Sequence, residues 1–403
     1  MKIFPWFQSK ASATTRAITM MLPLGTPPMP RINYKALAEE GYSGNTVVFA
    51  CIREIAEACA GVEWGVYKKI PDRRRERIHD HPVLELLRKP NPFQGRFELF
   101  ESAVSYLYLS GNMYMESVDS GSGRDNPTPP HELYILRPDR IKILPHPVHR
   151  VGGYEYEVGG RKQKFSSKQI LHLKLFNPLS DWYGLSPVQV ASLAIDKLNQ
   201  GDRWNAALLQ NSAVPSGALV SKQRLSDEQF RRLREEMREQ LQGIRHAREP
   251  LLLEQDLDWK ELGVSPKDMD WIEGLKLSAT QIAQVFNVPP ELVGLQEATY
   301  QNRKEARKAL YTEVVCPVLN RLRDGLNQWL VPRYGTEWRL EYDRDSIPAL
   351  AEDQESLWNR ANESSFLTIN EKRRLVGYGE IPGGDSLNIR DAGSGKDLHT
   401  HEK

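Results

Sequence analysis

The chain has 403 residues, of which 40% are hydrophobic and 27% charged, enough for more than one hydrophobic core and for two or three domains. Its 54 Lys and Arg residues almost balance its 53 Asp and Glu residues, so the formal net charge is +1. This balance argues against a protein that holds DNA tightly and without specificity, because such binding depends on a clear excess of basic residues.

The cysteines and the hydropathy pattern indicate a reduced, non-secreted protein. Cys51, Cys59 and Cys316 show no C-x-x-C spacing, so we expect them to be reduced core residues. No stretch of 18 uncharged apolar residues occurs, which predicts no membrane span. The first 30 residues lack a small-residue cleavage site of the secretory kind, so we expect a cytosolic protein.

The N-terminal third begins with residues 1–43, which show no hydrophobic period and predict a flexible arm. Folded structure is expected to start near Asn45. Apolar residues from Val48 to Cys59 recur at spacings of three and four, which predicts a helix that ends at Gly61. A strand is expected next, and the basic run at 73–77 is interpreted as an exposed, solvated loop.

Residues 97–110 predict a second amphipathic helix, and Gly111 is expected to close it in the left-handed conformation. The hydrophobic period then changes from about 3.6 to two. Alternating segments predict strands at 133–144, 154–158, 161–165 and 170–175. The Gly159–Gly160 pair predicts a tight hairpin. Residues 45–182 are therefore expected to form an α+β domain.

Three helix starts follow. Ser186 and Pro187 have the residue types of an N-cap and a first helical position, and the helix is expected to reach about Asn211. Ser226 and Gln229 predict a capped, highly charged helix between strand-like residues at 216–220 and 250–255. Ser265 and Pro266 predict a third helix, which ends at Val288-Pro289-Pro290.

A helix of about 30 residues is expected from Asn302 to Val331. It contains Pro317, which removes a backbone donor and clashes with the preceding turn, so a kink is expected near Glu313 to Pro317. Residues 338–343 then alternate as a strand, and a charged helical tail closes the chain.

The sequence contains no convincing catalytic or metal-binding motif. Gly393 to Lys396 resemble the end of a phosphate-binding loop, but the earlier glycine and the final Ser or Thr are missing. There is no H-E-x-x-H and no G-x-S-x-G. Asp268 and Asp270 are explained by their place at a predicted helix start, where the helix dipole favours carboxylates. We therefore expect no enzyme, no metal and no cofactor.

Several local phrases, in a fixed order, resemble the portal family of HK97-like phages over residues 45–390. They are HPVLELLRKPNP at 81–92, SGNMYME at 110–116, YGLSPVQVA at 183–191, NSAVPSGAL at 211–219, QIAQVFNVPPELVG at 281–294, ATYQN at 298–302, CPVLNRLRDGLNQWL at 316–330 and FLTINEKRRLVG at 366–377. Each phrase alone is weak evidence for this resemblance, whereas the order and spacing of all the phrases together are specific to the family.

The resemblance implies an α+β portal fold with a wing, a helical stem, a clip, a tunnel loop, a long kinked helix and a short C-terminal crown. The implied divisions are a flexible arm at 1–43, the wing at 44–183, stem helices at 184–211 and 266–287, the clip at 212–265, the tunnel loop at 288–301, the kinked helix with a returning wing strand at 302–350, the crown at 351–390 and a disordered tail at 391–403.

The implied function is that of a portal, or head–tail connector, subunit. In the family, usually twelve copies form a ring through which double-stranded DNA enters and leaves a capsid. Its partners are the large terminase subunit, neck or adaptor proteins and the major capsid protein, without any membrane. The expected location is the capsid vertex of the virion, and the host cytoplasm during assembly.

The resemblance also suggests two sets of functional residues. In the tunnel loop, the side chains expected to contact DNA are Leu292, Val293, Leu295, Gln296, Thr299 and Tyr300. They carry no positive charge, which favours weak contacts that break easily over tight phosphate binding. In the clip, motor or intersubunit contacts are expected from Arg231, Arg232, Arg234, Arg238, Arg245 and Arg248. The alternative for these arginines is a solvated face with weak helical ion pairs.

Two other functions remain open at this point. One is a soluble α+β hydrolase whose scattered Asp, Glu and His residues meet only in the fold, and turnover by an isolated monomer would favour it. The other is a capsid adaptor ring without a DNA channel, which a pore too narrow for duplex DNA would favour.

Overall fold

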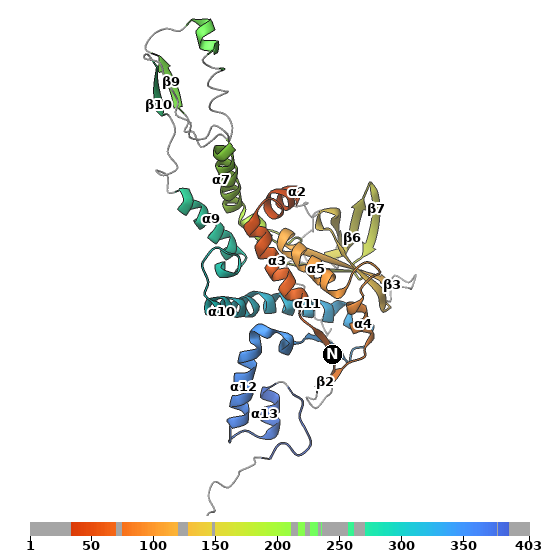
Figure 1. Ribbon diagram of the computed structural model, residues 1–403. Helices are drawn as coiled ribbons and strands as arrows, with labels where there is room; N and C mark the ends of the chain where they lie inside the picture. Colours follow the sequence, from red (N-terminus) through yellow and green to blue (C-terminus); the bar gives the residue numbers. More distant parts are fainter. Residues whose placement is uncertain are drawn as a thin grey trace, which may run out of the picture.

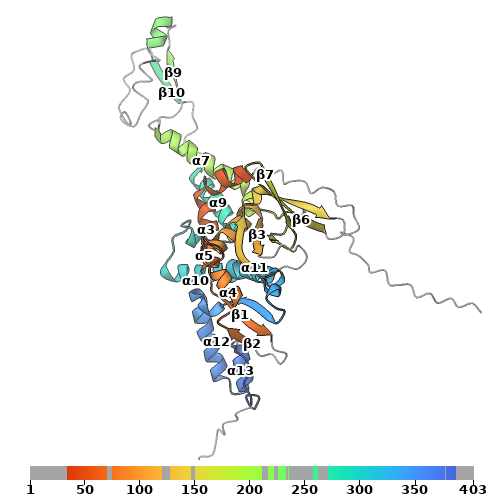
Figure 2. The same ribbon diagram turned by 90° about the vertical axis from the view of Figure 1, so that its right-hand side faces the viewer.

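The computed structural model shows an elongated molecule with a central α+β body and a projection at each end (Figures 1 and 2). It describes residues 34–69, 75–119, 128–146, 150–210, 217–221, 226–232, 235, 257–261, 271–376 and 378–386. One projection carries helix α7 and strands β9 and β10, and the other carries helices α12 and α13. Helical and sheet segments are largely separate along the chain, as in an α+β fold.

The described chain begins with helical structure earlier than the sequence predicts. Helix α2 (Tyr34–Ala36) continues into a π-helical segment at Leu37–Tyr42, and Tyr34 and Leu37 pack against the hydrophobic core. The expectation that folded structure begins only near Asn45 is therefore wrong. The apolar side chains of this segment span about two helical turns, which is too short for a hydrophobic period to be recognised in the sequence. Asn45 instead caps helix α3, its Oδ1 accepting hydrogen bonds from the backbone of Val47 and Val48.

Helix α3 (Thr46–Ala60) ends before Gly61, as expected, and leads into a three-stranded antiparallel sheet. Its strands are β1 (Trp64–Lys69), β2 (Arg75–Ile78) and β11 (Trp338–Tyr342), in the order β11-β1-β2. The interpretation of the basic run as a loop is wrong for Arg75–Arg77, since these residues pair with β1. Strand β11 lies far from β1 in the sequence, and its pairing with β1 brings the chain back to the N-terminal body.

Helices α4 (Pro82–Arg88) and α5 (Arg96–Ser110) come next, and Gly111 closes α5 at φ +77°, in the left-handed region that the sequence predicts. Two further antiparallel sheets follow. One has the order β4-β3-β8, from β3 (Asn112–Asp119), β4 (Pro130–Leu136) and β8 (Ile170–Lys174); the other has the order β5-β6-β7, from β5 (Ile141–His146), β6 (Arg150–Val158) and β7 (Arg161–Ser166). The β6–β7 turn contains Gly159 and Gly160, both at positive φ, which confirms the predicted hairpin.

Two hydrophobic cores hold these layers together. The larger core joins α3 and α5 to Met113 and Met115 of β3, and all three cysteines are buried, as predicted. The smaller core lies between the two sheets and includes Tyr114, Tyr154 and Phe165. Because successive residues of a strand face opposite sides, β3 contributes to both cores, and its first four residues are all buried.

The C-terminal half is mostly helical. Its elements are α6 (Pro187–Val190), α7 (Ser192–Gln210), β9 (Gly217–Ser221), β10 (Leu257–Glu261), α9 (Trp271–Val285), α10 (Tyr300–Leu310), α11 (Cys316–Trp329), α12 (Ala351–Glu363) and α13 (Ile369–Leu375). Among the helices that the structure describes, none has the length and apolar character needed to cross a bilayer.

Candidate functional site

A pair of packed helices carries the projecting part of the molecule. Helices α7 and α9 lie against each other, and Ile195 of α7 and Ile282 of α9 belong to the same buried core (Figure 1). Phe286, after the end of α9, stacks on Tyr108 of α5 with ring centroids 6.1 Å apart. The pair is therefore fixed to the central body and the helices do not lie in separate cores.

Ser186 fixes the start of this pair to the body. Its Oγ accepts a hydrogen bond from the backbone of Gln189, as an N-cap does, and donates to the carbonyl oxygen of Leu109 over 2.7 Å. The predicted single helix is divided, because α6 ends at Val190 and α7 begins at Ser192. The predicted start of α9 at Ser265 and Pro266 lies outside the described residues, as do Asp268 and Asp270.

Beyond α7, the chain forms a two-stranded antiparallel sheet in which β9 pairs with β10. The strand-like signal at 216–220 corresponds to β9, which pairs with β10. The other strand-like signal, at 250–255, lies outside the described residues. Ser226 and Gln229 exchange the two hydrogen bonds of the predicted capping box. Arg231 and Arg232 follow on the surface, while Arg234, Arg238, Arg245 and Arg248 lie outside the described residues.

Residues 288–301 connect α9 to α10, and their first half is tightly anchored. Asn287 adopts a left-handed conformation with φ of 54°, which turns the chain at the end of α9. The backbone N–H of Val288 donates to Ala283, and that of Leu295 donates to Pro290. Leu292 is buried in the large core, and Val293 and Leu295 are half-buried against it.

The second half of this connection is exposed. Gln296, Thr299 and Tyr300 all lie on the surface, and Tyr300 is 86% exposed. Thr299 also caps α10, its Oγ1 accepting from the backbone of Asn302. The six residues predicted to contact DNA therefore divide: three reach solvent, two reach it in part, and the buried Leu292 instead anchors the loop.

The loop carries no lysine or arginine between Val288 and Gln301, and its ionisable side chains are Glu291, Glu297 and Tyr300. The first cations after it are Arg303 and Lys304 in the first turn of α10, both exposed. The exposed surface of the loop is therefore uncharged or acidic, and basic side chains begin at Arg303.

The helical rod formed by α10 and α11, which follows the loop, changes from α-helical to π-helical geometry just before Pro317. A π-helical segment at Tyr311–Val315 separates α10 from α11, and Pro317 stands in the first turn of α11. A π-helical turn widens the hydrogen-bond pattern where proline supplies no donor. The rod is also tied to α3, because Arg307 makes an ion pair with Glu54 over 2.7 Å.

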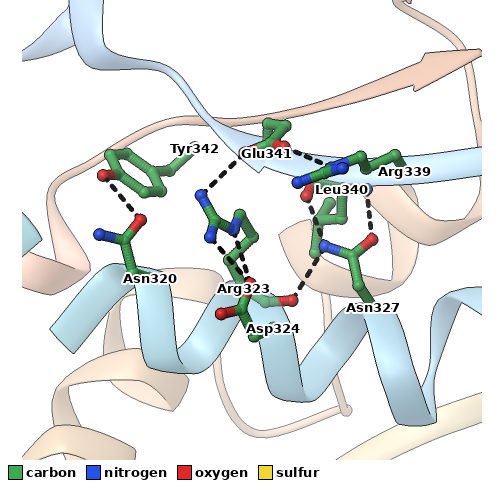
Figure 3. A network of polar contacts seen from close by, with 8 residues as sticks. All are labelled: Asn320, Arg323, Asp324, Asn327, Arg339, Leu340, Glu341 and Tyr342. Carbon is green, nitrogen blue, oxygen red and sulfur yellow. Dashed lines mark hydrogen bonds and ion pairs between the residues drawn. The ribbon is translucent and has the colours of Figure 1, made fainter. Parts of the chain in front are cut away.

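A polar network attaches α11 to the returning strand β11 (Figure 3). Asn327 donates from Nδ2 to the carbonyl oxygen of Leu340 over 2.7 Å and accepts at Oδ1 from its N–H over 2.8 Å. The amide side chain thus satisfies both backbone groups of a strand residue, as a neighbouring strand would. Arg323 adds ion pairs to Asp324 and Glu341.

Sequence reasoning missed two contributions to this region. The segment at 34–42 packs on the body, and Asn199 of α7 donates to the carbonyl oxygen of Glu40 in that segment. Strand β3 was missed as well, although burial on both faces makes it central. In the described ranges, no cluster of three or more His, Cys, Asp or Glu side chains is arranged to hold a metal ion.

Comparison with known proteins identifies the family. A family model described as phage portal protein matches residues 46–377. The chain is 25% identical to the portal protein of Enterobacteria phage HK97 over 348 residues, which cover 84% of this chain and 80% of that protein. It is 40% identical to a chain from the neck of a native gene transfer agent (GTA) particle with C12 symmetry, with a TM-score of 0.68 and coverage of 90% of this chain and 98% of that one.

A portal protein of the HK97 family from Corynebacterium diphtheriae shares the fold, with a TM-score of 0.54 at 16% identity and coverage of 78% of this chain and 96% of that one. The predicted portal fold class is thereby confirmed. Portal proteins are structural channel subunits, so the hydrolase alternative is wrong. The chain belongs to the phage portal protein family and is a portal, or head–tail connector, subunit.

Proposed function

We propose that twelve copies of this chain form a ring at the vertex of a capsid, and that double-stranded DNA passes through its centre during packaging and ejection. The observation that carries this proposal is the 40% identity over 90% of the chain with a protein in a particle neck of C12 symmetry. The packed α7–α9 pair supports it further, since it supplies a rigid projecting element that neighbouring copies can place side by side.

The loop at 288–301 is proposed to contact the passing DNA through Gln296, Thr299 and Tyr300, with partial contributions from Val293 and Leu295. These side chains are uncharged and reach solvent to different degrees. Contacts without ion pairs to phosphate release few counterions, so they are weak and easily broken. Leu292 is left out of this set because its side chain is buried.

The segment at 212–265 is proposed to dock the large terminase subunit during packaging and neck or adaptor proteins afterwards. Its exposed Arg231 and Arg232 support an electrostatic contact with an acidic partner surface. Contact with the major capsid protein and assembly in the host cytoplasm complete the proposal. The ATP-driven step belongs to the terminase, which agrees with the incomplete phosphate-loop motif of this chain.

Native mass spectrometry of the purified chain tests the subunit count. The expected spectrum has one dominant assembly with twelve times the mass of a 46.1 kDa chain. A dominant monomer or dimer at every concentration would contradict the ring, and a closed ring of another number would correct the count alone.

A charge insertion tests the role of the loop. Gln296→Arg places one guanidinium per copy on the proposed DNA-facing surface, and it should raise the affinity of the ring for duplex DNA with a steeper salt dependence. Leu179→Arg is the matched control, because Leu179 is exposed at the surface of the wing. Equal effects of the two substitutions would contradict a specific contact at the loop.

A further inference from the structure

Strand β8 is an edge strand whose outer side is open to a groove. The sheet order β4-β3-β8 leaves one side of β8 without a neighbouring strand. Along it lies a groove of about 680 Å³, lined by residues of β6 and β8, of the loop before Tyr183 and of the end of α11. An exposed strand edge offers backbone groups to any further strand, so native proteins usually protect such edges.

The register with β3 shows which backbone groups of β8 face the groove. The N–H of Leu175, just after β8, donates to the carbonyl oxygen of Gly111, just before β3, so the odd-numbered residues of β8 bond to β3. Successive residues of an antiparallel strand direct their backbone groups to opposite sides. The N–H and C=O groups of Ile170 and His172 therefore point to the free edge.

Side chains from α11 and the turn after it cover the two ends of this edge. The carbonyl oxygen of Lys168 accepts from Nε1 of Trp329 over 2.7 Å and from the guanidinium of Arg333. At the other end, the carbonyl oxygen of Lys174 accepts from Arg321 over 2.8 Å. These side chains act in place of a neighbouring strand, but only at the ends.

The middle of the edge has no such cover. Among the residues that the structure describes, none bonds to the edge-facing backbone groups of Ile170 and His172. Strand β7, which is also an edge strand, shows the usual protection, because Arg161, Lys162 and Lys164 are exposed on it. The middle of β8 therefore keeps the hydrogen-bonding capacity of a site for a further strand.

The walls of the groove are mostly apolar and aromatic. Helix α11 packs against the face of β8 that carries Leu171, and Tyr154 of β6 meets His172 on the opposite face. The large side chains of the two walls are Trp329 and Pro332 on the α11 side and Val151, Tyr154 and Trp182 on the β6 side. Since a strand sends alternate side chains to opposite sides, a strand that fits here is apolar on both faces.

The sequence before Tyr34, outside the described residues, contains a segment of this kind. Residues 17–22 read AITMML, six residues without a charge, in which only Thr19 has a polar side chain. Ile18 and Thr19 are β-branched, which favours a strand, and Pro23 follows at a position where a strand can end. Residues 3–7 are also apolar, but Pro5 removes a backbone donor from the middle of that run.

The groove is within reach of this segment. Tyr34 lines a pocket together with Tyr114, and Tyr114 stacks on His172 of β8 with centroids 4.3 Å apart. The eleven residues 23–33 span up to about 36 Å when extended. The apolar run at 250–255 leads instead into β10, which stands on the distant projection (Figures 1 and 2).

We propose that residues 17–22 of each copy add to the free edge of β8 as a fourth strand of the β4-β3-β8 sheet and bond to Ile170 and His172. In such strand addition the backbone hydrogen bonds supply affinity, and the alternate side chains supply specificity. The segment fills the groove and keeps the edge from pairing with other proteins. Because the contact lies within one copy, the proposal does not depend on the proposed ring.

Hydrogen exchange resolved to single residues tests the proposal, with the full-length chain compared with a variant that lacks residues 1–24. We expect the amides of Ile170 and His172 to exchange at least about tenfold faster in the variant. The amide of Leu171, which bonds to β3, is the internal control and should change much less. Equal exchange of Ile170 and His172 in the two chains would overturn the proposal.

A substitution in the full-length chain gives the same readout without truncation. Met20→Asp places a carboxylate between the apolar walls, so the amides of Ile170 and His172 should exchange about tenfold faster than in the native chain. Met29→Asp, outside the proposed strand, is the matched control and should leave the native rates. Native rates in Met20→Asp, or equal acceleration by the two substitutions, would count against the assignment.

A synthetic peptide tests which segment is bound. The peptide of residues 16–24, added to the truncated variant, should restore slow exchange of Ile170 and His172, whereas the peptide of residues 1–9 should not. Restoration by both peptides would overturn the choice of segment.

The monomer and ring fractions of the native chain test whether the strand comes from the same copy. Slow exchange of Ile170 and His172 in both fractions is the expected result. Slow exchange in the ring alone would assign the strand to a neighbouring copy and overturn the contact within one copy.

Discussion

A Cβ atom placed on Gly111 would lie 2.7 Å from the carbonyl oxygen of Gly184, so the backbones at these two positions touch without room for a side chain. Asn112 reinforces the contact, its Oδ1 accepting from the N–H of Gly184 over 2.8 Å. The end of α5 and the entry to the α6–α7 helices are thereby fixed together. This junction therefore fixes the position of the projecting helices relative to the body.

Gly111→Ala should lower the free energy of unfolding by about 2 kcal/mol or more. The substitution combines a left-handed backbone, which costs an L-residue about 1–2 kcal/mol, with a clash against Gly184. Gly274→Ala in α9 is the control, because a Cβ added there meets no atom within 4 Å beyond its own stretch of helix and alanine favours helix. Urea titration of both variants makes the comparison, and an equal midpoint for Gly111→Ala and the native chain would refute the close contact.

Ser186→Ala should cost about 2 kcal/mol. It removes the cap of α6 and leaves the buried carbonyl group of Leu109 without the 2.7 Å hydrogen bond from Oγ. Ser226→Ala, at an exposed cap in which Oγ accepts from the backbone N–H of Gln229, should cost about 1 kcal/mol or less. Thermal unfolding of the two variants gives the difference, and a larger loss for Ser226→Ala would reverse this account.

Arg333 and Asp119 form a buried ion pair with a 3.0 Å contact, in which the side chains are 4% and 14% exposed. Arg333 also donates to the hydroxyl of Ser117, so its loss leaves the part-buried Asp119 carboxylate without its cation and removes a hydrogen bond to Ser117. Arg333→Met should destabilise the chain by about 3–5 kcal/mol. The exposed Lys35–Glu39 pair supplies the control, since Lys35→Ala should change stability by no more than about 0.5 kcal/mol.

His172 should make the free energy of unfolding decrease as the pH is lowered. It stacks on Tyr114 with centroids 4.3 Å apart, and burial lowers its pKa from 6.5 to about 3. Between these pH values the unfolded chain binds a proton at this position and the folded chain does not, so protonation favours unfolding. The unfolding free energy of the native chain should therefore fall more steeply between pH 6.5 and pH 3 than that of His172→Gln.

Denaturant titrations across this pH range provide the measurement, and the difference between the two curves isolates His172 from the other titrating groups. If His172→Gln and the native chain had parallel curves, the imidazole would not be held neutral by the fold.

The sequence predicts most elements whose signals are local. Caps at Ser186, Ser226 and Gly111 and the Gly159–Gly160 hairpin occur where the residue types require them. These features depend on a few neighbouring residues, so they can be recognised without tertiary contacts.

What the sequence does not predict depends on contacts between distant segments. Strand β3 is buried on both faces and shows no clean alternation. The basic residues of β2 pair with β1, although their composition resembles a loop. For the loop at 288–301, composition indicates a lack of positive charge, but only the fold distinguishes the buried Leu292 from the exposed Tyr300.

Cryo-electron microscopy of the purified chain at high concentration tests the central claim most directly. The account predicts closed rings in which α7 and α9 of adjacent copies lie side by side around a central channel wide enough for B-form DNA. Compact monomers at every concentration, or rings whose opening cannot admit a duplex, would contradict it.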